Sequence, residues 1–223
     1  EIGSGLVGSE MCIRDSDKKV INNAINTDHS IDIALFGRMV ADDPSLNTDA
    51  SVQVAHSIST HRVDNEYDYF TAVDDKAPED NAGAGMIGTV EYNSSTLYRY
   101  ATIAVHDLKD LLGDEGVSAV AVSEFIRAFI LSMPTGKQNT FANRTVPYST
   151  YITIRNDQPL NLSPAFEMPV QMDVSGGYNA PSTVKMIGYA KKAYSEFVDS
   201  PVASWQLSLI HISAPTRPEP ISY

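Results

Sequence analysis

The chain has 223 residues, 43% of them hydrophobic and 20% charged, a balance typical of a soluble protein with one domain-sized core. No apolar run approaches the roughly 20 residues that cross a bilayer, so we expect no membrane segment. A single cysteine, Cys12, excludes an intramolecular disulfide and a zinc site with several cysteines, which suits the reducing cytoplasm. The formal charge of −12 argues, taken alone, against nucleic-acid binding, because phosphate contacts normally need clustered Lys and Arg.

The two ends of the chain are related through the DNA that encodes them. The codons of residues 6–16 (LVGSEMCIRDS) can be chosen so that their reverse complement reads LSLIHISEPT, and residues 207–217 read LSLIHISAPTR. We interpret residues 1–16 and 207–223 as translated sequencing adapter, against the alternative that residues 207–212 form a hydrophobic strand. Without these segments, which carry two arginines and four acidic residues, the formal charge is −10. Residues 17–206 are then expected to be a fragment of a longer gene product.

Two strands are predicted first along the chain. Residues 31–36 (IDIALF) are largely apolar and end at Gly37, which predicts a buried strand. Residues 51–60 alternate between apolar and polar side chains, which predicts a half-buried strand. Its inner face would carry Val52, Val54, His56 and Ile58.

An acidic stretch at residues 64–81 follows. It can bury little of itself, so we expect it to project as an arm. Its carboxylates lack the spacing of a calcium loop and no cleft is visible, so they indicate a solvated surface rather than a metal or catalytic site. They are Asp64, Glu66, Asp68, Asp74, Asp75, Glu79 and Asp80.

Three glycines after the acidic stretch, Gly83, Gly85 and Gly88, fit the G-x-G-x-x-G pattern of dinucleotide-binding loops. In such loops the last glycine opens a helix whose amides hold the pyrophosphate. Here the run leads into residues 89–92 (TVEY), which are strand-like. The pattern therefore does not indicate a nucleotide site.

The remaining elements form a strand, helix, strand unit and a final helix. Residues 96–105 predict a strand, residues 117–133 a helix ended by Pro134, and residues 148–155 a strand. Residues 180–199 predict an amphipathic helix that closes the core. Its shared face would carry Val184, Ile187, Ala190 and Tyr194.

Two features are typical of contacts with single-stranded nucleic acid. Tyr69 and Phe70 lie on the expected arm with no core to fill, and a base stacked on such a ring contributes about 1–3 kcal/mol. Residues 136–139 (GKQN), with Arg144 nearby, can bring amides and a cation to a phosphate. A partner-protein contact or a plain exposed loop explains both features equally well at this point.

Five ordered blocks of the sequence resemble the CasC (Cas-seven) family, the backbone subunit of the type I-E CRISPR Cascade complex. They are DIALFGRM (32–39), VAHSISTH (54–61), DYFTAVDD (68–75), NSSTLYRYA (93–101) and GKQNTFANRTVP (136–147). The resemblance covers about residues 31–170. It implies an α+β fold with a modified RRM-like (ferredoxin-like) palm, a thumb hairpin at about residues 60–92, and a truncated N-terminus. The truncated part would carry a basic RNA-contacting segment, whose loss accounts for the acidic charge.

The resemblance also implies a function in antiviral defence. Copies of the chain would stack along a guide RNA (crRNA) with other Cascade subunits, and would expose it for pairing with target DNA. No cofactor, metal or catalytic residue is expected. By motif match, the thumb tip would wedge into a kink in the RNA and Met39 would pack on the displaced nucleotide, with Lys137 and Gln138 near the RNA backbone. The thumb-tip residues are Tyr69, Phe70, Thr71 and Val73.

Two other functions stay open from the sequence. One is an RNA-processing endoribonuclease of a related repeat-associated family, which would need an acid or base such as Asp42 or a histidine beside the scissile phosphate. The other is a protein-interaction module whose arm docks a partner without nucleic acid. The loss of RNA cleavage on joint substitution of Asp42, Asp43, His56 and His61 would favour the first function. Unchanged guide binding after replacement of Tyr69 and Phe70 by alanine would favour the second.

Overall fold

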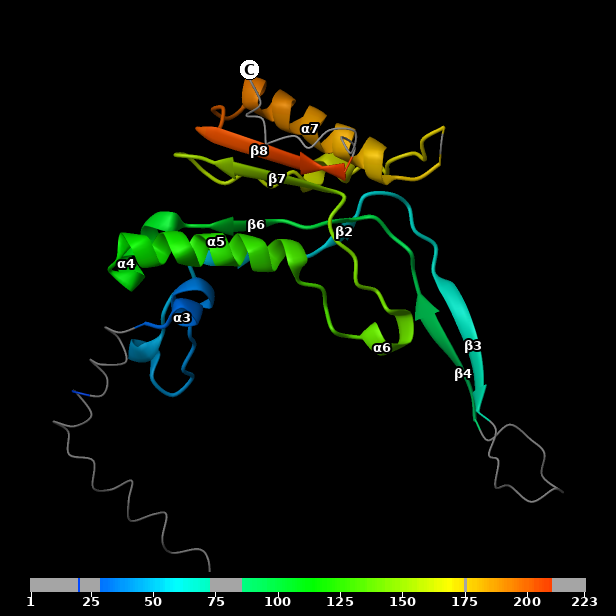
Figure 1. Cartoon of the computed structure of the whole chain (residues 1–223), viewed down its shortest axis with the longest axis horizontal. Helices are drawn as coiled ribbons and strands as arrows, with labels where there is room; N and C mark the ends of the chain where they lie inside the picture. The colour runs from blue at the N-terminus through cyan, green and yellow to red at the C-terminus, as the bar shows by residue number, and fades with distance from the viewer. Residues whose placement is uncertain (1–19, 21–28, 73–85, 175, 210–223) are drawn as a thin grey trace, which may run out of the picture. The chain divides into compact units, whose positions relative to one another are not determined.

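The computed structural model describes residues 20, 29–72, 86–174 and 176–209. They belong to two compact units. Unit 1 contains the residues up to Ala55 together with residues 101–147, and unit 2 contains residues 56–100 together with those from Tyr148 on. Helices and antiparallel strands occur in both units (Figure 1), so the expected α+β class is confirmed.

Unit 1 begins with a short helix, α3 (Ile31–Phe36), where the sequence predicted a buried strand. The hydroxyl of Ser30 caps it by accepting a hydrogen bond from the backbone N–H of Ile33 at 3.4 Å. Gly37, at φ 76°, ends it and donates its own N–H to the Ile33 carbonyl. The strand prediction was wrong because a six-residue apolar run does not distinguish a strand from one buried helical turn, and the cap decides.

The strands predicted at residues 51–60 and 96–105 are each broken into two pieces. In unit 1, β1 (Val52–Val54) and β6 (Ala101–Ile103) pair antiparallel, with Val52 opposite Ile103. The predicted inner face is only partly right, since Val52 is buried whereas Val54 and His56 are exposed. The pieces that fall in unit 2 pair with each other as β2 (Ile58–Ser59) and β5 (Leu97–Tyr98).

Two helices complete the core of unit 1. The sequence missed α4 (Val105–Leu112), which ends at Gly113 in the left-handed region with φ 65°. The predicted helix at 117–133 is confirmed as α5 (Glu115–Leu131), which begins because the Asp114 carboxylate accepts from the Val117 N–H at 2.8 Å. The buried hydrophobic side chains of this unit cluster together, and they are Ala34, Leu35, Val52, Leu108, Ala121 and Phe125.

Unit 2 is built on the antiparallel pair of β7 (Ser149–Ile154) and β8 (Ala203–Ser208) with helix α7 (Asn179–Glu196). The hydroxyls of Tyr151 on β7 and Tyr194 on α7 lie 3.2 Å apart and form a hydrogen bond. The strand predicted at 148–155 is confirmed. The buried cluster of this unit comprises Tyr98, Leu162, Ala165, Phe166, Val170 and Ala190.

The helix predicted at residues 180–199 is confirmed as α7. Its predicted face is right at Ala190, which is buried, and wrong at Val184. Val184 is 70% exposed. The buried residues Ser182, Thr183, Ala190 and Ala193 are small, which lets the helix approach its neighbours closely. Small polar residues were not counted as core in the sequence pattern, and this explains the error.

Strand β8 extends into the segment that we interpret as adapter. Leu207 lies opposite Thr150, and Ser208 lies opposite Ser149. This pairing describes the conformation of the two residues and does not test the origin of their codons, so the interpretation stays a prediction. The described strands form four two-stranded ladders, and the RRM-like palm likewise stays an expectation.

We predict that Leu108→Ala destabilises unit 1 by about 2–5 kcal/mol, because Leu108 is fully buried and its truncation leaves a cavity. Leu131→Ala on α5, where the side chain is 57% exposed, is the matched control and should cost less than about 0.5 kcal/mol. Urea denaturation followed by circular dichroism measures both. Equal losses for the two variants would contradict the core assignment.

Candidate nucleic-acid interface

The described part of the expected arm is an antiparallel hairpin of β3 (Glu66–Ala72) and β4 (Met86–Tyr92), called the hairpin below (Figure 1). Every residue of β3 is exposed. Because side chains alternate along a strand, Tyr69 and Phe70 point to opposite faces of the hairpin. The sequence treated them as one pair of adjacent rings, and the register separates them.

Phe70 lies against its cross-strand partner, Gly88. A Cβ atom on Gly88 would stand only 2.6 Å from Cζ of the Phe70 ring, so the ring occupies the space that a side chain would fill. Phe70 is accordingly 36% exposed, whereas Tyr69 is 64% exposed. Gly88 therefore has a packing role. Gly83 and Gly85 lie outside the described residues.

The hairpin is acidic. Its described strands carry Glu66, Asp68 and Glu91 and contain no Lys or Arg. Tyr92 donates its hydroxyl to Oε2 of Glu66 at 3.2 Å. The negative charge of Glu66 raises the pKa of Tyr92, because ionisation of the phenol would place two anions side by side. The described strands of the hairpin thus offer aromatic faces and carboxylates, and they offer no cation for a phosphate.

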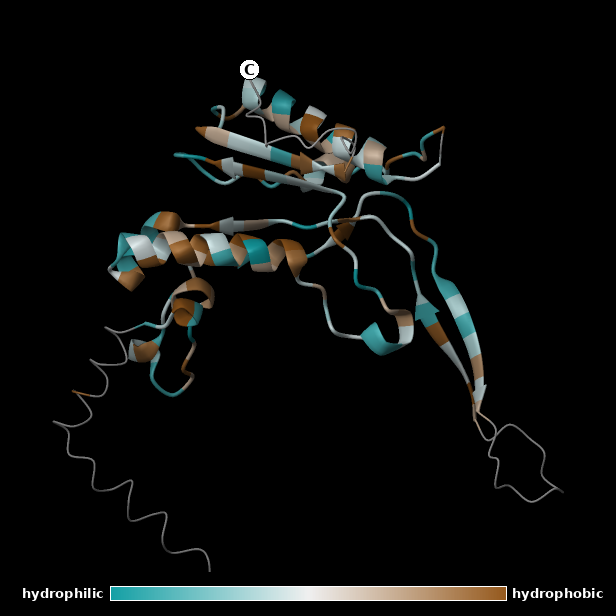
Figure 2. Cartoon of the chain, in the orientation of Figure 1, coloured by the Kyte–Doolittle hydropathy of each residue, from teal (hydrophilic) through white to brown (hydrophobic). Residues whose placement is uncertain are grey.

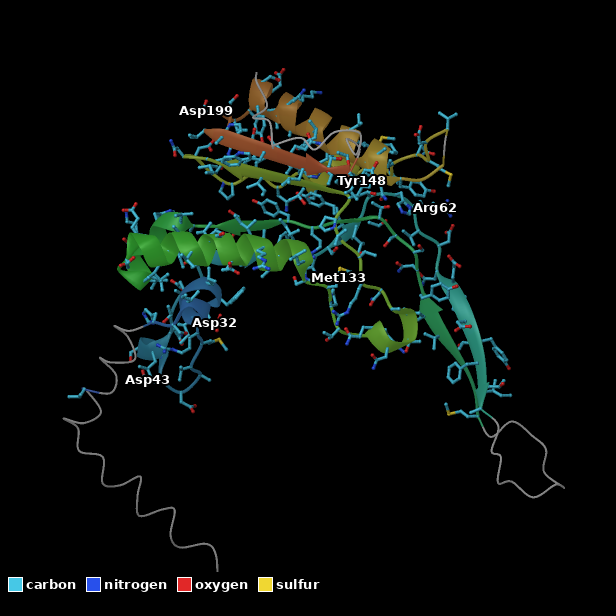
Figure 3. All side chains as sticks on the ribbon, viewed as in Figure 1. Asp32, Asp43, Arg62, Met133, Tyr148 and Asp199 are labelled. Carbon is cyan, nitrogen blue, oxygen red and sulfur yellow. The ribbon has the colours of Figure 1, made fainter. Side chains whose placement is uncertain are left out.

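At the root of the hairpin, His61 is only 8% exposed. Its Nε2 atom accepts the backbone N–H of Thr96 at 3.0 Å, so the ring proton is assigned to Nδ1, which donates to the Arg62 carbonyl at 2.7 Å. The ring stacks on Tyr178 with centroids 3.7 Å apart. From the sequence, His61 is considered only as a candidate base of the alternative endoribonuclease, and its structural role is missed. Figure 3 labels Arg62, where the chain leaves this root for β3.

Thr60 adds further bonds at the same root. Its N–H donates to the Thr96 carbonyl at 2.9 Å, and its own carbonyl accepts from the Val170 N–H at 2.9 Å. Its hydroxyl accepts from that of Ser182 on α7 at 2.8 Å, in a buried setting. Both chain segments that enter the hairpin are therefore tied to one another and to the body of unit 2.

The loop of residues 136–144, called the basic loop below, belongs to unit 1 and contains the short helix α6 (Gln138–Phe141). Lys137 is exposed and adopts a left-handed backbone conformation with φ 59°, which a non-glycine residue adopts at a cost of order 1 kcal/mol. Gln138 is half-buried, and its side-chain oxygen accepts from the Arg144 guanidinium at 3.0 Å. In Figure 3 Met133 marks the point where the chain leaves α5 towards this loop.

Met39, also in unit 1, is 86% exposed. It lies at the edge of a shallow hollow whose other lining residues include Phe36, Gly37 and Arg38. Phe36 is 58% exposed, with its ring 6.1 Å from that of Phe125 in the core. Met39 and Phe36 therefore give unit 1 a small apolar surface.

The predicted site residues divide between the two units. Met39, Lys137 and Gln138 belong to unit 1, and Tyr69, Phe70 and Thr71 belong to the hairpin of unit 2. Val73 lies outside the described residues. The interface role of all seven stays a prediction.

The endoribonuclease alternative is not supported by a metal site among the described residues. No group of three or more His, Cys, Asp or Glu side chains among them could hold a metal ion. Of the four acid or base candidates, Asp42 and His56 are exposed, Asp43 is half-buried, and His61 is buried at the root of the hairpin. No helix in the described ranges is long and apolar enough to cross a membrane.

Comparison with known proteins gives one family and 59 matching chains of solved structures, two of which are as follows. The sequence profile of the CT1975-like protein family matches residues 8–219. A chain of a solved structure described as "CRISPR RNA-guided surveillance complex, pre-nicking" is 34% identical with a TM-score of 0.76, and the match covers 85% of this chain and 50% of that one. A chain of a "CRISPR RNA-guided surveillance complex" is 32% identical with a TM-score of 0.73, covering 86% and 73%. No curated protein matches the chain.

We predict that His61→Ala destabilises the root of the hairpin by about 1–3 kcal/mol, because it leaves the Thr96 N–H without its acceptor. Amide hydrogen exchange at Thr96 should accelerate accordingly. His56→Ala removes an exposed histidine nearby and should leave both quantities unchanged. Exchange at Thr96 as slow as in the wild type would refute this role of His61.

Proposed function

The chain belongs to the CT1975-like protein family, and on that premise we propose that it binds guide RNA as a backbone subunit of a CRISPR surveillance complex, in antiviral defence. The observation that carries the proposal is the exposed hairpin, whose rings have no core to fill. The chain spans half the length of the first matched chain, so the activity of the whole protein is part of the proposal.

The finer assignment is to the CasC kind of subunit in a type I-E complex. Copies of the chain stack along the crRNA with other Cascade subunits, and the RNA pairs with target DNA. The subunit works in the cytoplasm and has no catalytic role. The five blocks that resemble CasC support this assignment, as do the printed descriptions of the two similar structures.

The contacts with RNA are divided between the two units by charge. The hairpin, which has no cation in its described strands, contacts bases: Phe70 wedges between nucleotides from one face, and Tyr69, Thr71 and Val73 complete the thumb tip at the kink. The basic loop contacts phosphates through Lys137, and Gln138 orients Arg144. Met39 packs on the displaced nucleotide. Because none of these contacts reads base identity, pairing by the guide supplies the sequence specificity.

Phe70→Ala should weaken binding of single-stranded guide RNA by roughly 5- to 150-fold, since a stacked base is worth about 1–3 kcal/mol. Fluorescence anisotropy with labelled RNA measures the dissociation constant. Phe197→Ala, at a phenylalanine that is 85% exposed outside the hairpin, is the matched control and should bind like the wild type. If Phe70→Ala also bound like the wild type, the hairpin would be a protein contact instead.

Lys137→Gln should reduce the slope of log K against log salt concentration by about 0.7, because one phosphate contact to a single strand is lost. Lys192→Gln on α7 replaces an exposed lysine outside the basic loop and should leave the slope unchanged. Phe70→Ala should also leave it unchanged, since a ring releases no counterions. An unaltered slope in Lys137→Gln would remove the basic loop from the interface.

A further inference from the structure

We propose that the face of the hairpin opposite Phe70 carries a second base-binding site, in which Tyr67 and Tyr69 clamp one unpaired RNA base between their rings. This inference rests on the proposed function, since it takes RNA as the ligand. It extends the motif match, which assigned Tyr69 and Thr71 on this face but not Tyr67, because Tyr67 lies outside the matched block. Figure 2 shows hydrophobic and hydrophilic residues mixed along both strands of the hairpin.

The spacing of the two tyrosines fits a flat aromatic ligand. Residues i and i+2 of a strand share a face and stand about 6.8 Å apart, because the rise is about 3.4 Å per residue. Successive nucleotides of a strand are spaced by about 3.4 Å, so two such spacings span the same distance. One base between Tyr67 and Tyr69 can therefore stack on both rings.

Neither tyrosine has another structural task in the described part of the chain. Tyr67 is 63% exposed and Tyr69 is 64% exposed. Their cross-strand partners, Glu91 and Thr89, are not aromatic and do not cover the rings. On the other face, by contrast, Phe70 fills the space over Gly88 and Tyr92 bonds to Glu66. The Tyr67 and Tyr69 rings are thus available to a ligand.

Charge selects the kind of ligand. Glu91 lies directly opposite Tyr67 on the same face, and no cation lies on the described strands of the hairpin. A phosphate would be repelled here, whereas a base presents an uncharged face. The Glu91 carboxylate can also accept from an exocyclic amino group, as carboxylates do with cytosine N4. The clamp should therefore prefer bases that carry an exocyclic amino group, such as cytosine, over uracil.

The test uses the full chain and fluorescein-labelled oligocytidine and oligouridine in anisotropy titrations. Tyr67→Thr removes the ring but keeps a residue that favours strands, and it should weaken oligocytidine binding by about 5- to 150-fold. Tyr67→Phe keeps the ring and should bind like the wild type. Glu91→Gln should narrow the preference for oligocytidine over oligouridine. A merely structural role of Glu91 would not give this change of base preference.

A second measurement does not depend on how well the variants fold. Ultraviolet cross-linking of the wild-type chain to oligocytidine, followed by mass spectrometry, should give adducts at Tyr67 or Tyr69. The clamp would be overturned if neither tyrosine gave an adduct and Tyr67→Thr kept full affinity for RNA. If Phe70→Ala nevertheless bound RNA more weakly, the proposed function would still stand. Failure of the wild-type chain to bind any RNA would overturn both. Altered self-association of Tyr67→Thr in ultracentrifugation, with unchanged RNA affinity, would make this face a protein contact and also overturn the clamp.

Discussion

The alternation of side chains on one exposed two-stranded hairpin is the constraint on which this account depends. The register places Phe70 over Gly88 on one face, and Tyr67 and Tyr69 on the other. A shift of one residue in the register would exchange the faces, and the ring of Phe70 would then lose the only position where its partner has no side chain. The glycine therefore helps to fix which aromatic rings each face presents.

A hairpin exposed on both faces needs an anchor, since a two-stranded ribbon is marginally stable by itself. His61 supplies one by accepting the Thr96 N–H and by stacking on Tyr178. Thr60 supplies another through its buried hydroxyl bond to Ser182. These contacts fix the root of the hairpin to unit 2 and leave the aromatic residues beyond it exposed. The absence of cations on its described strands then fits contacts with bases, and the basic loop of unit 1 is suited to phosphates.

Much of this fold could be predicted from the sequence where the periodicity is long. Helix α5 has five apolar residues at helical spacing and a polar cap, and strand β7 has an uninterrupted run of β-formers. Short elements could not be predicted. Helix α3 depends on the cap at Ser30. The strands predicted at 51–60 and 96–105 are broken because one half of each belongs to unit 1 and the other half to unit 2. The site residues came from motif resemblance. The separation of Tyr69 from Phe70 needed only the assignment of this segment as a strand, because successive side chains of a strand alternate. The burial of His61 could not be predicted from the sequence, because it depends on contacts with Thr96 and Tyr178, which are distant along the chain.

The central claim is that RNA covers the aromatic side chains of the hairpin, and hydroxyl-radical footprinting of the full chain tests it most directly. Oxidation of Tyr67, Tyr69 and Phe70 is measured by mass spectrometry with and without single-stranded RNA, with Phe197 as an internal reference outside the hairpin. The account predicts that RNA suppresses oxidation of the three hairpin rings and leaves Phe197 unchanged. Equal oxidation of the hairpin rings in both samples, with RNA bound, would contradict it.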